Sequence, residues 1–96
     1  MLEISETERF ARWFERLPDP ETRRRILVRL RRLSLGNRGD VTPVGAPVSE
    51  LRIHYGPGYR IYFTMHTSSV VILLAGGDKR TQKRDIRAAI ALANNL

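Results

Sequence analysis

The clearest hydrophobic pattern in this chain is a period-two alternation of apolar and polar residues over positions 50–63, ELRIHYGPGYRIYF. Such alternation is typical of antiparallel strands that bury one face. Gly56-Pro57-Gly58 interrupts it, and glycines flanking a proline favour a tight turn because glycine adopts positive φ angles. The pattern therefore predicts a β-hairpin. One face would bury Leu51, Ile53, Ile61 and Phe63, and the other would present Arg52, His54, Arg60 and Tyr62.

Helical spacing precedes and follows the hairpin. Phe10, Trp13, Phe14 and Leu17 stand at i, i+3, i+4 and i+7, which predicts a helix with its apolar stripe in the core. Ser5-Glu6-Thr7-Glu8 has the spacing of a capping box at its start. A last helix is expected over residues 81–93, with a stripe of Ile86, Ala89, Ile90 and Ala93.

A second helix is expected between the first helix and the hairpin. Asp19 suits the N-cap, Pro20 the first helical position, and Gly36 the C-terminal cap after Leu35. Its inward positions would be Ile26, Leu27, Leu30 and Leu33. Its outer face carries Arg23, Arg24, Arg25, Arg29, Arg31 and Arg32, with no acidic residue after Glu21.

The remaining apolar runs complete the expected fold. Leu2–Ile4 alternates like a short strand, residues 41–44 could add another, and the continuous run Val70–Ala75 indicates a central strand buried on both sides. The order is then β-α-α-β-β-β-α. We expect one α+β domain over residues 1–96, with the helices packed on one face of a small antiparallel sheet. The opposite face, bearing Arg52, His54 and Arg60, would stay open.

The net charge of the chain indicates which class of partner it binds. Seventeen Lys and Arg against ten Asp and Glu give 96 residues a net charge of +7, which favours a polyanion such as nucleic acid. We assign Arg24, Arg25, Arg29 and Arg32 to RNA binding, with a merely solvated helix face as the alternative. The apolar run Val70–Ala75 is far too short to span a bilayer, no signal peptide is visible, and no membrane partner is expected.

Candidate chemistry lies on the polar face of the hairpin. The chain has no Cys, which excludes disulfides and thiol catalysis and is compatible with a reducing cytoplasm. His54 and His66 are the only histidines and few carboxylates stand near them in the sequence, so we expect no metal site and no cofactor. RNA can be cleaved by its own 2′-hydroxyl when a protein supplies a base, an acid and cations.

The residues allow specific roles in such a cleavage. Arg52 and Arg60 would hold the phosphate, His54 would carry a proton, and Tyr62 would stack on a base or orient the phosphate. Lys79 and Arg80, where the last strand ends, would close the site from the side. Passive phosphate binding and a solvated sheet face are the alternatives that the spacing leaves open.

These segments together resemble a known family. The arginine-rich helix, then GNRGD, ELRIHYGPGYRIYF and LLAGGDKRTQKRDI, are similar to the RelE/ParE toxin superfamily, above all its phage-derived Gp49-like, HigB-type addiction module killer branch. The resemblance runs from about Phe10 to Ala91. Its most specific parts are GPGYR (56–60) and GGDKRTQ (76–82).

The resemblance implies a RelE-like fold and the toxin of a type II toxin–antitoxin pair. Toxins of the RelE kind cut mRNA in the ribosomal A site without metal, and an antitoxin, often a helix-turn-helix protein in this branch, neutralises them in a hetero-oligomer. By position, Arg60 matches the best-defined site arginine, Arg52 and His54 match the basic pair on the preceding strand, and Lys79 and Arg80 match the pair after the last strand.

The resemblance also leaves two questions open. Some relatives carry a catalytic tyrosine in the last helix, whereas residues 85–87 here read Asp-Ile-Arg, and Asp78 is the nearest acidic candidate. The acid and base are therefore unassigned. The rival functions are a ParE-like inhibitor of DNA gyrase and a catalytically inactive RNA-binding or interaction module.

Overall fold

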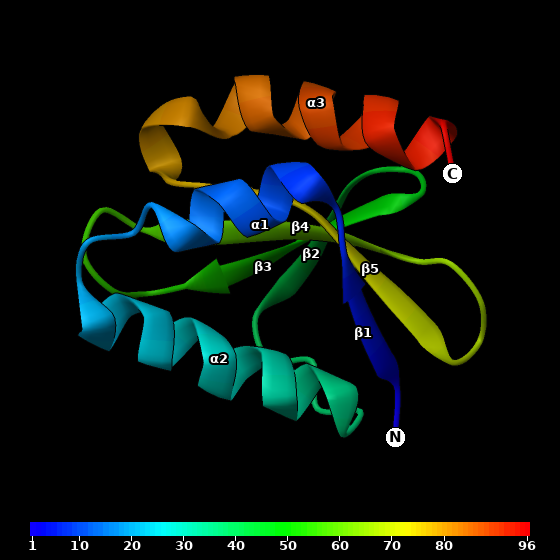
Figure 1. Ribbon diagram of the computed structural model, residues 1–96. Helices are drawn as coiled ribbons and strands as arrows, with labels where there is room; N and C mark the ends of the chain where they lie inside the picture. Colours follow the sequence, from blue (N-terminus) through cyan, green and yellow to red (C-terminus); the bar gives the residue numbers. More distant parts are fainter.

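The computed structural model describes residues 1–96 as three α-helices and a five-stranded mixed sheet, an α+β arrangement (Figure 1). The elements in chain order are β1 (Glu3–Glu6), α1 (Glu8–Glu15), α2 (Pro20–Ser34), β2 (Val41–Gly45), β3 (Val48–Ile53), β4 (Tyr59–Met65), β5 (Val70–Gly77), the 3-10 helix η1 (Lys79–Thr81) and α3 (Gln82–Asn94). The short strand at residues 41–45 joins the sheet as β2. No helix of the protein is both long and apolar enough to cross a membrane.

The strand order in the sheet is β1-β5-β4-β3-β2. The predicted hairpin is confirmed: β3 pairs antiparallel with β4 between Ser49↔Phe63 and Ile53↔Tyr59, and the turn glycines Gly56 and Gly58 both have positive φ. The expectation of a purely antiparallel sheet is wrong, because β1 runs parallel to β5. Thr7 fixes this pairing: its amide donates to the Leu73 carbonyl and its hydroxyl to the Leu74 carbonyl, at 2.9 and 2.7 Å.

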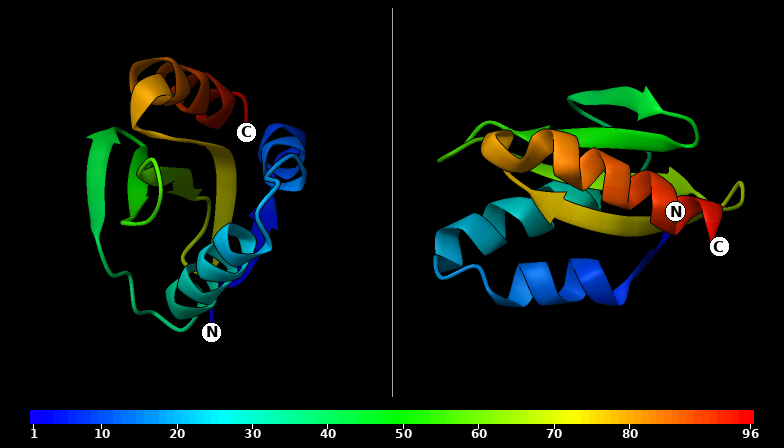
Figure 2. Two further views of the ribbon diagram at one scale, coloured as in Figure 1. Left: turned by 90° about the vertical axis from the view of Figure 1, so that its left-hand side faces the viewer. Right: turned by 90° about the horizontal axis from the view of Figure 1, so that it is seen from above.

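Helices cover both faces of the sheet, which corrects the prediction of one covered and one open face (Figure 2). Helices α1 and α2 pack on one face, around Phe10, Leu17, Ile26, Leu30 and Leu33. Helix α3 packs on the other face, where Val48, Tyr62, Leu74, Ala75 and Ala89 form a second apolar cluster. Helix α3 covers the second face because its apolar stripe must be buried against the sheet, and α1 and α2 already cover the first face.

The first core follows the sequence pattern closely. Leu51, Ile53, Ile61 and Phe63 of the hairpin all point into it, as their alternation predicts. Phe10 and Leu17 are buried, and Trp13 and Phe14 pack against the same cluster. The prediction that Leu27 faces inward is wrong, since 54% of this residue is exposed.

Two helix boundaries test the capping predictions. Helix α2 begins as expected, with Asp19 as N-cap accepting from the Glu21 amide and Pro20 in the first turn. Helix α1 begins later than the capping box predicts: Ser5 lies in β1, and Thr7 is the N-cap whose hydroxyl accepts from the Phe10 amide. Strand pairing with β5 holds Ser5 extended, so the next hydroxyl residue takes over the cap.

A bulge near the end of β5 decides which helix each residue faces. Tyr62 pairs with Ala75 and Phe63 with Leu73, so Leu74 is an extra residue in the ladder. Beyond the bulge, Gly76 faces Trp13 of α1 and Gly77 faces Asp85 of α3. Neither position has room for a side chain. A Cβ on Gly76 would lie 2.2 Å from the Trp13 ring, and one on Gly77 would lie 1.9 Å from the Asp85 carboxylate.

We predict that Gly76→Ala lowers the free energy of unfolding by about 1–3 kcal/mol, the usual cost of overpacking a filled site. Chemical denaturation checks this. The matched control is the same substitution in a Trp13→Ala background, where the added methyl has room and costs much less. Equal costs in the two backgrounds would show that the indole does not impose the glycine.

Candidate functional site

Arg52 and Arg60, two of the predicted site residues, lie side by side on β3 and β4. They are register partners in the antiparallel ladder. Both guanidinium groups meet one oxygen of Glu50: Arg52 Nε donates to Glu50 Oε1 at 2.9 Å, and Arg60 Nη1 lies 3.5 Å from the same atom. The structure therefore brings together the arginine pair that the alternation predicts, and a shared carboxylate aligns it.

Glu50 is a site residue that the sequence reasoning missed. Its side chain is fully buried beneath α3, and its second oxygen accepts a 2.9 Å hydrogen bond from Gln82 Nε2 at the start of that helix. A buried carboxylate is stable only when it is paired and hydrogen-bonded. Glu50 lies two residues before Arg52 in β3 and so shares its face, but its burial depends on α3, which comes from the other end of the chain.

The protein itself satisfies only some of the hydrogen-bond donors of Arg60. Its side chain is 13% exposed, its Nε is buried without a hydrogen-bond partner, and its one ion pair is the long contact to Glu50. A guanidinium carries five N–H donors that suit a phosphate in bidentate geometry. Arg60 therefore keeps donors for an anion. The Arg52 side chain is more open, at 38% exposed.

The loop after β5 brings Lys79 and Arg80 to the same end of the sheet. Arg60 pairs with Gly77 in the ladder, and a Cβ built on Gly58 of the hairpin turn would lie 3.7 Å from the Lys79 Cβ. Arg80 is largely exposed and forms an ion pair with Asp78 at 3.2 Å. Burial opposes ionisation of Asp78, but hydrogen bonds from Arg80 outweigh it and lower its pKa. Asp78 is thus held as a carboxylate and caps η1.

Tyr62 does not occupy the position predicted for it. The side chain is fully buried in the second core beneath α3, so it cannot stack on a base in this conformation. Its hydroxyl is buried near Glu50 and forms no hydrogen bond of normal geometry. Burial, and then the Glu50 carboxylate, raise its pKa. The prediction failed because it assumed an open sheet face.

His54 lies in a groove beside α2. It follows the last residue of β3, and its Nε2 is 2.6 Å from Asp40 Oδ2. It lines a groove against α2 together with Arg24, Arg25, Val28, Arg29, Arg32, Ile53 and Tyr55. The structure thus groups His54 with the arginines of α2, and not with Arg60 and Lys79.

The four arginines predicted to bind RNA therefore line one groove, and several of them have partners within the protein. Arg24 and Arg25 both pair with Glu21, and the Arg25 guanidinium also lies 4.2 Å from the centre of the Tyr55 ring. Arg29 donates to the Arg52 carbonyl at 2.8 Å. The groove retains a basic surface, because Glu21 is the only acidic residue of α2. No cluster of three or more His, Cys, Asp or Glu side chains is placed to hold a metal ion.

We predict that Glu50→Gln destabilises the fold by about 3 kcal/mol. This is the low end of the cost of breaking a buried ion pair, because Arg52 is partly screened by solvent. Thermal and urea unfolding measure the effect. Glu3→Gln, on the exposed strand β1, is the matched control and should change stability by less than about 0.5 kcal/mol. A neutral Glu50→Gln would mean that hydrogen bonding alone holds the cluster.

The Asp40–His54 contact predicts a specific pH response. The hydrogen bond from His54, helped by the charges of Arg52 and Arg29, lowers the pKa of Asp40 against a smaller opposing effect of burial. Because this pKa is lower in the folded state, the pair stabilises the protein above the unfolded-state value of about 3.9, and this contribution is lost as pH falls through the folded value. In an NMR titration, His54→Ala should raise the pKa of Asp40 and leave that of Asp78 unchanged.

Comparison with known proteins gives one family model and one similar relative. The sequence profile described as "Phage derived protein Gp49-like (DUF891)" matches residues 12–96. An uncharacterized protein of Haemophilus influenzae is 41% identical over 95 residues, which covers 99% of this chain and 96% of the relative. The profile match includes every element from within α1 to the C-terminus, and with them Arg52, Arg60 and Glu50. The chain therefore belongs to the phage-derived Gp49-like protein family.

Proposed function

We propose that this protein is the toxin of a type II toxin–antitoxin pair and that it cleaves messenger RNA on the ribosome without a metal ion. Membership of the phage-derived Gp49-like family supports a toxin–antitoxin context. The observation that carries the chemical part is the register pair Arg52 and Arg60, aligned by the buried carboxylate of Glu50. Lys79 and Arg80 extend the same positive region.

The proposed reaction is an internal transesterification of RNA. The 2′-oxygen loses its proton and attacks the neighbouring phosphorus, the bond to the 5′-oxygen breaks, and that oxygen takes up a proton. The products are a 2′,3′-cyclic phosphate and a free 5′-hydroxyl. Negative charge increases on the phosphoryl oxygens in the transition state, and fixed guanidinium groups stabilise it most effectively when they are oriented in advance.

Each predicted site residue except Tyr62 has a role in this proposal. Arg60 and Arg52 bind the scissile phosphate, and Lys79 and Arg80 neutralise the transition state and the leaving group. Arginine is a poor proton donor because it stays charged. We retain His54 as the proton carrier to be tested, although it lies in the groove beside α2. Tyr62 has no role, because it is buried.

The proposed partners follow from the size and charge of the domain. A 96-residue domain has little surface with which to read bases, so the ribosome would position the message. The α2 arginines Arg24, Arg25, Arg29 and Arg32 would contact ribosomal RNA. A cognate antitoxin, of the helix-turn-helix type, would neutralise the toxin in a cytoplasmic hetero-oligomer. A neighbouring reading frame for such a protein would support this part of the proposal.

The proposal predicts that Arg60→Ala abolishes message cleavage, with a loss of at least about 10²-fold, as expected when a group that stabilises transition-state charge is removed. The measurement is brief induction in cells, followed by mapping of new 5′ ends on translated and untranslated copies of one message. Arg38→Ala is the matched control, since Arg38 is exposed in the loop after α2 and forms no ion pair. Cleavage of the translated copy alone is the expected result.

Other results would point elsewhere. Cuts on both copies would mean a ribosome-independent nuclease, and His54→Ala would then be the decisive variant. Growth arrest without cuts would overturn the proposal and favour inhibition of DNA gyrase. Absence of both arrest and cuts would indicate an inactive binding module.

A further inference from the structure

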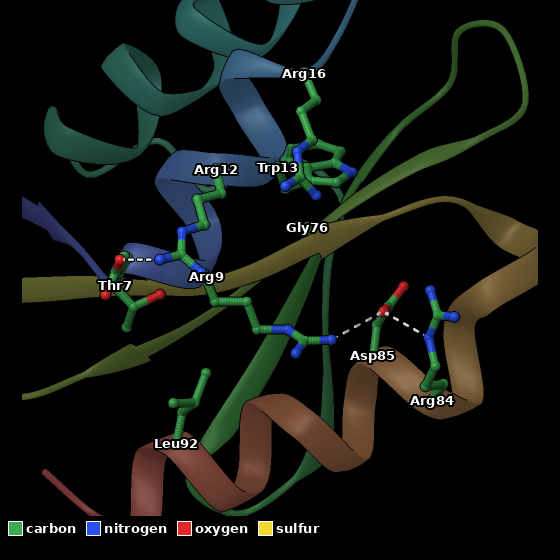
Figure 3. A pocket seen from close by; sticks show the side chains of 10 residues that line it. Thr7, Arg9, Arg12, Trp13, Arg16, Gly76, Arg84, Asp85 and Leu92 are labelled. Atoms are coloured by element: carbon green, nitrogen blue, oxygen red, sulfur yellow. Dashed lines mark hydrogen bonds and ion pairs between the residues drawn. The ribbon is translucent and has the colours of Figure 1, made fainter.

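A polar pocket opens between α1 and α3 at the exposed edge of β5 (Figure 3). It exists because β1 pairs with β5 only as far as Leu73, so the end of β5 has no strand beside it on that edge. The two helices take the place of the missing strand, with Trp13 packed over Gly76 and Asp85 packed over Gly77. The pocket volume is about 570 Å³, which falls in the usual range for ligand sites.

Arginines dominate the pocket wall. Arg9 and Arg12 come from α1, Arg16 caps its C-terminal end, and Arg84 faces them from α3. Against these stand two carboxylates, Glu8 and Asp85, so the ionisable lining has a net charge of +2. Arg12 is paired with Glu8, whereas Arg16 is exposed and forms no ion pair.

Asp85 lies between two of these arginines, Arg9 and Arg84, and interacts with both. Its side chain is only 3% exposed, and its Oδ2 accepts a hydrogen bond from the Thr81 hydroxyl. Its other oxygen, Oδ1, lies 3.9 Å from Arg9 Nη2 and 3.7 Å from Arg84 Nε. These distances are too long for hydrogen bonds, so both guanidinium groups are attracted to the pocket while their N–H donors stay available. Figure 3 shows Arg9 and Arg84 approaching Asp85 from opposite sides.

The residues that line the pocket favour a ligand with several phosphate groups over a protein partner. Only two of the ten lining residues, Trp13 and Leu92, are apolar, whereas a docked helix needs several apolar anchors at regular spacing. Separate guanidinium groups, in contrast, suit phosphate oxygens. The pocket also neighbours a second basic surface, because Arg84 lines both. That surface consists of Lys79, Arg80, Thr81, Gln82, Lys83, Arg84 and Arg87.

We propose that the α1–α3 pocket is a second phosphate site, which binds the backbone of single-stranded RNA as it leaves the region of Lys79 and Arg80. The inference rests on the proposed function for its choice of RNA. Arg84 is the link: it contributes to both surfaces. Arg9 and Arg16 belong to the pocket alone and therefore report on it specifically.

The test measures binding of a labelled, 2′-O-methylated single-stranded oligoribonucleotide, which cannot be cleaved, by purified protein over a series of salt concentrations. The slope of log affinity against log salt concentration falls by about 0.7 for each phosphate contact that is lost. We expect Arg16→Ala to reduce the slope by about 0.7 and Arg9→Ala/Arg16→Ala to reduce it by about 1.4. Arg38→Ala is the control of equal charge and should match the wild type.

Removal of Arg9 also leaves Asp85 with one ionic partner fewer, so thermal unfolding of each variant is measured alongside. Arg16→Ala, which breaks no ion pair or side-chain hydrogen bond, gives the result if the double variant is unstable. Slopes equal to the control, or no binding by the wild type, would overturn the inference.

The two proposals fail in different ways. Message cleavage that depends on Arg60, with unchanged slopes in the pocket variants, would overturn the inference alone. Reduced slopes in a protein that cuts no message would support the RNA site and overturn the proposed nuclease.

Discussion

Strand β5 ends in two glycines, Gly76 and Gly77, and the packing of α1 and α3 depends on their lack of side chains. Gly76 lets the Trp13 ring lie against the strand from the α1 side, and Gly77 lets Asp85 lie against it from the α3 side. Both helices can therefore close on a strand edge that β1 leaves unpaired. Asp78 follows Gly77 and caps η1, and Lys79 after it lies beside the hairpin turn. Any larger residue would separate at least one helix from the sheet.

A second constraint is electrostatic. Glu50 is a charged side chain with no exposure, and it is stable there because two guanidinium groups and the Gln82 amide surround it. This arrangement keeps the arginines oriented before any ligand arrives, which is how fixed charges act most strongly on a phosphate. Gln82 belongs to α3, so the packing of that helix and the alignment of Arg52 and Arg60 depend on each other.

Positive charge is divided between two sides of the sheet. Four arginines of α2 line one groove with His54, and His54 contacts Asp40. Arg52 and Arg60 form a register pair on β3 and β4. Lys79 and Arg80 lie on a basic surface that shares Arg84 with the pocket between α1 and α3. A partner that met both sides would have to be extended and anionic. His54 belongs to the first groove, and Asp40 lies between it and Arg52, whose charge lowers the Asp40 pKa. Strand alternation could not reveal this placement of His54.

The sequence by itself determined the local elements and their apolar faces. Period-two alternation placed Leu51, Ile53, Ile61 and Phe63 in one core and Arg52 beside Arg60, because strand geometry depends only on residue parity and the turn. Helical spacing, Asp19 and Pro20 likewise located α2. Only the tertiary structure decided what α3 covers, that β1 runs parallel to β5, and that a bulge at Leu74 resets the alternation. The burial of Tyr62, Glu50 and Asp85 follows from these long-range contacts, which no local pattern encodes.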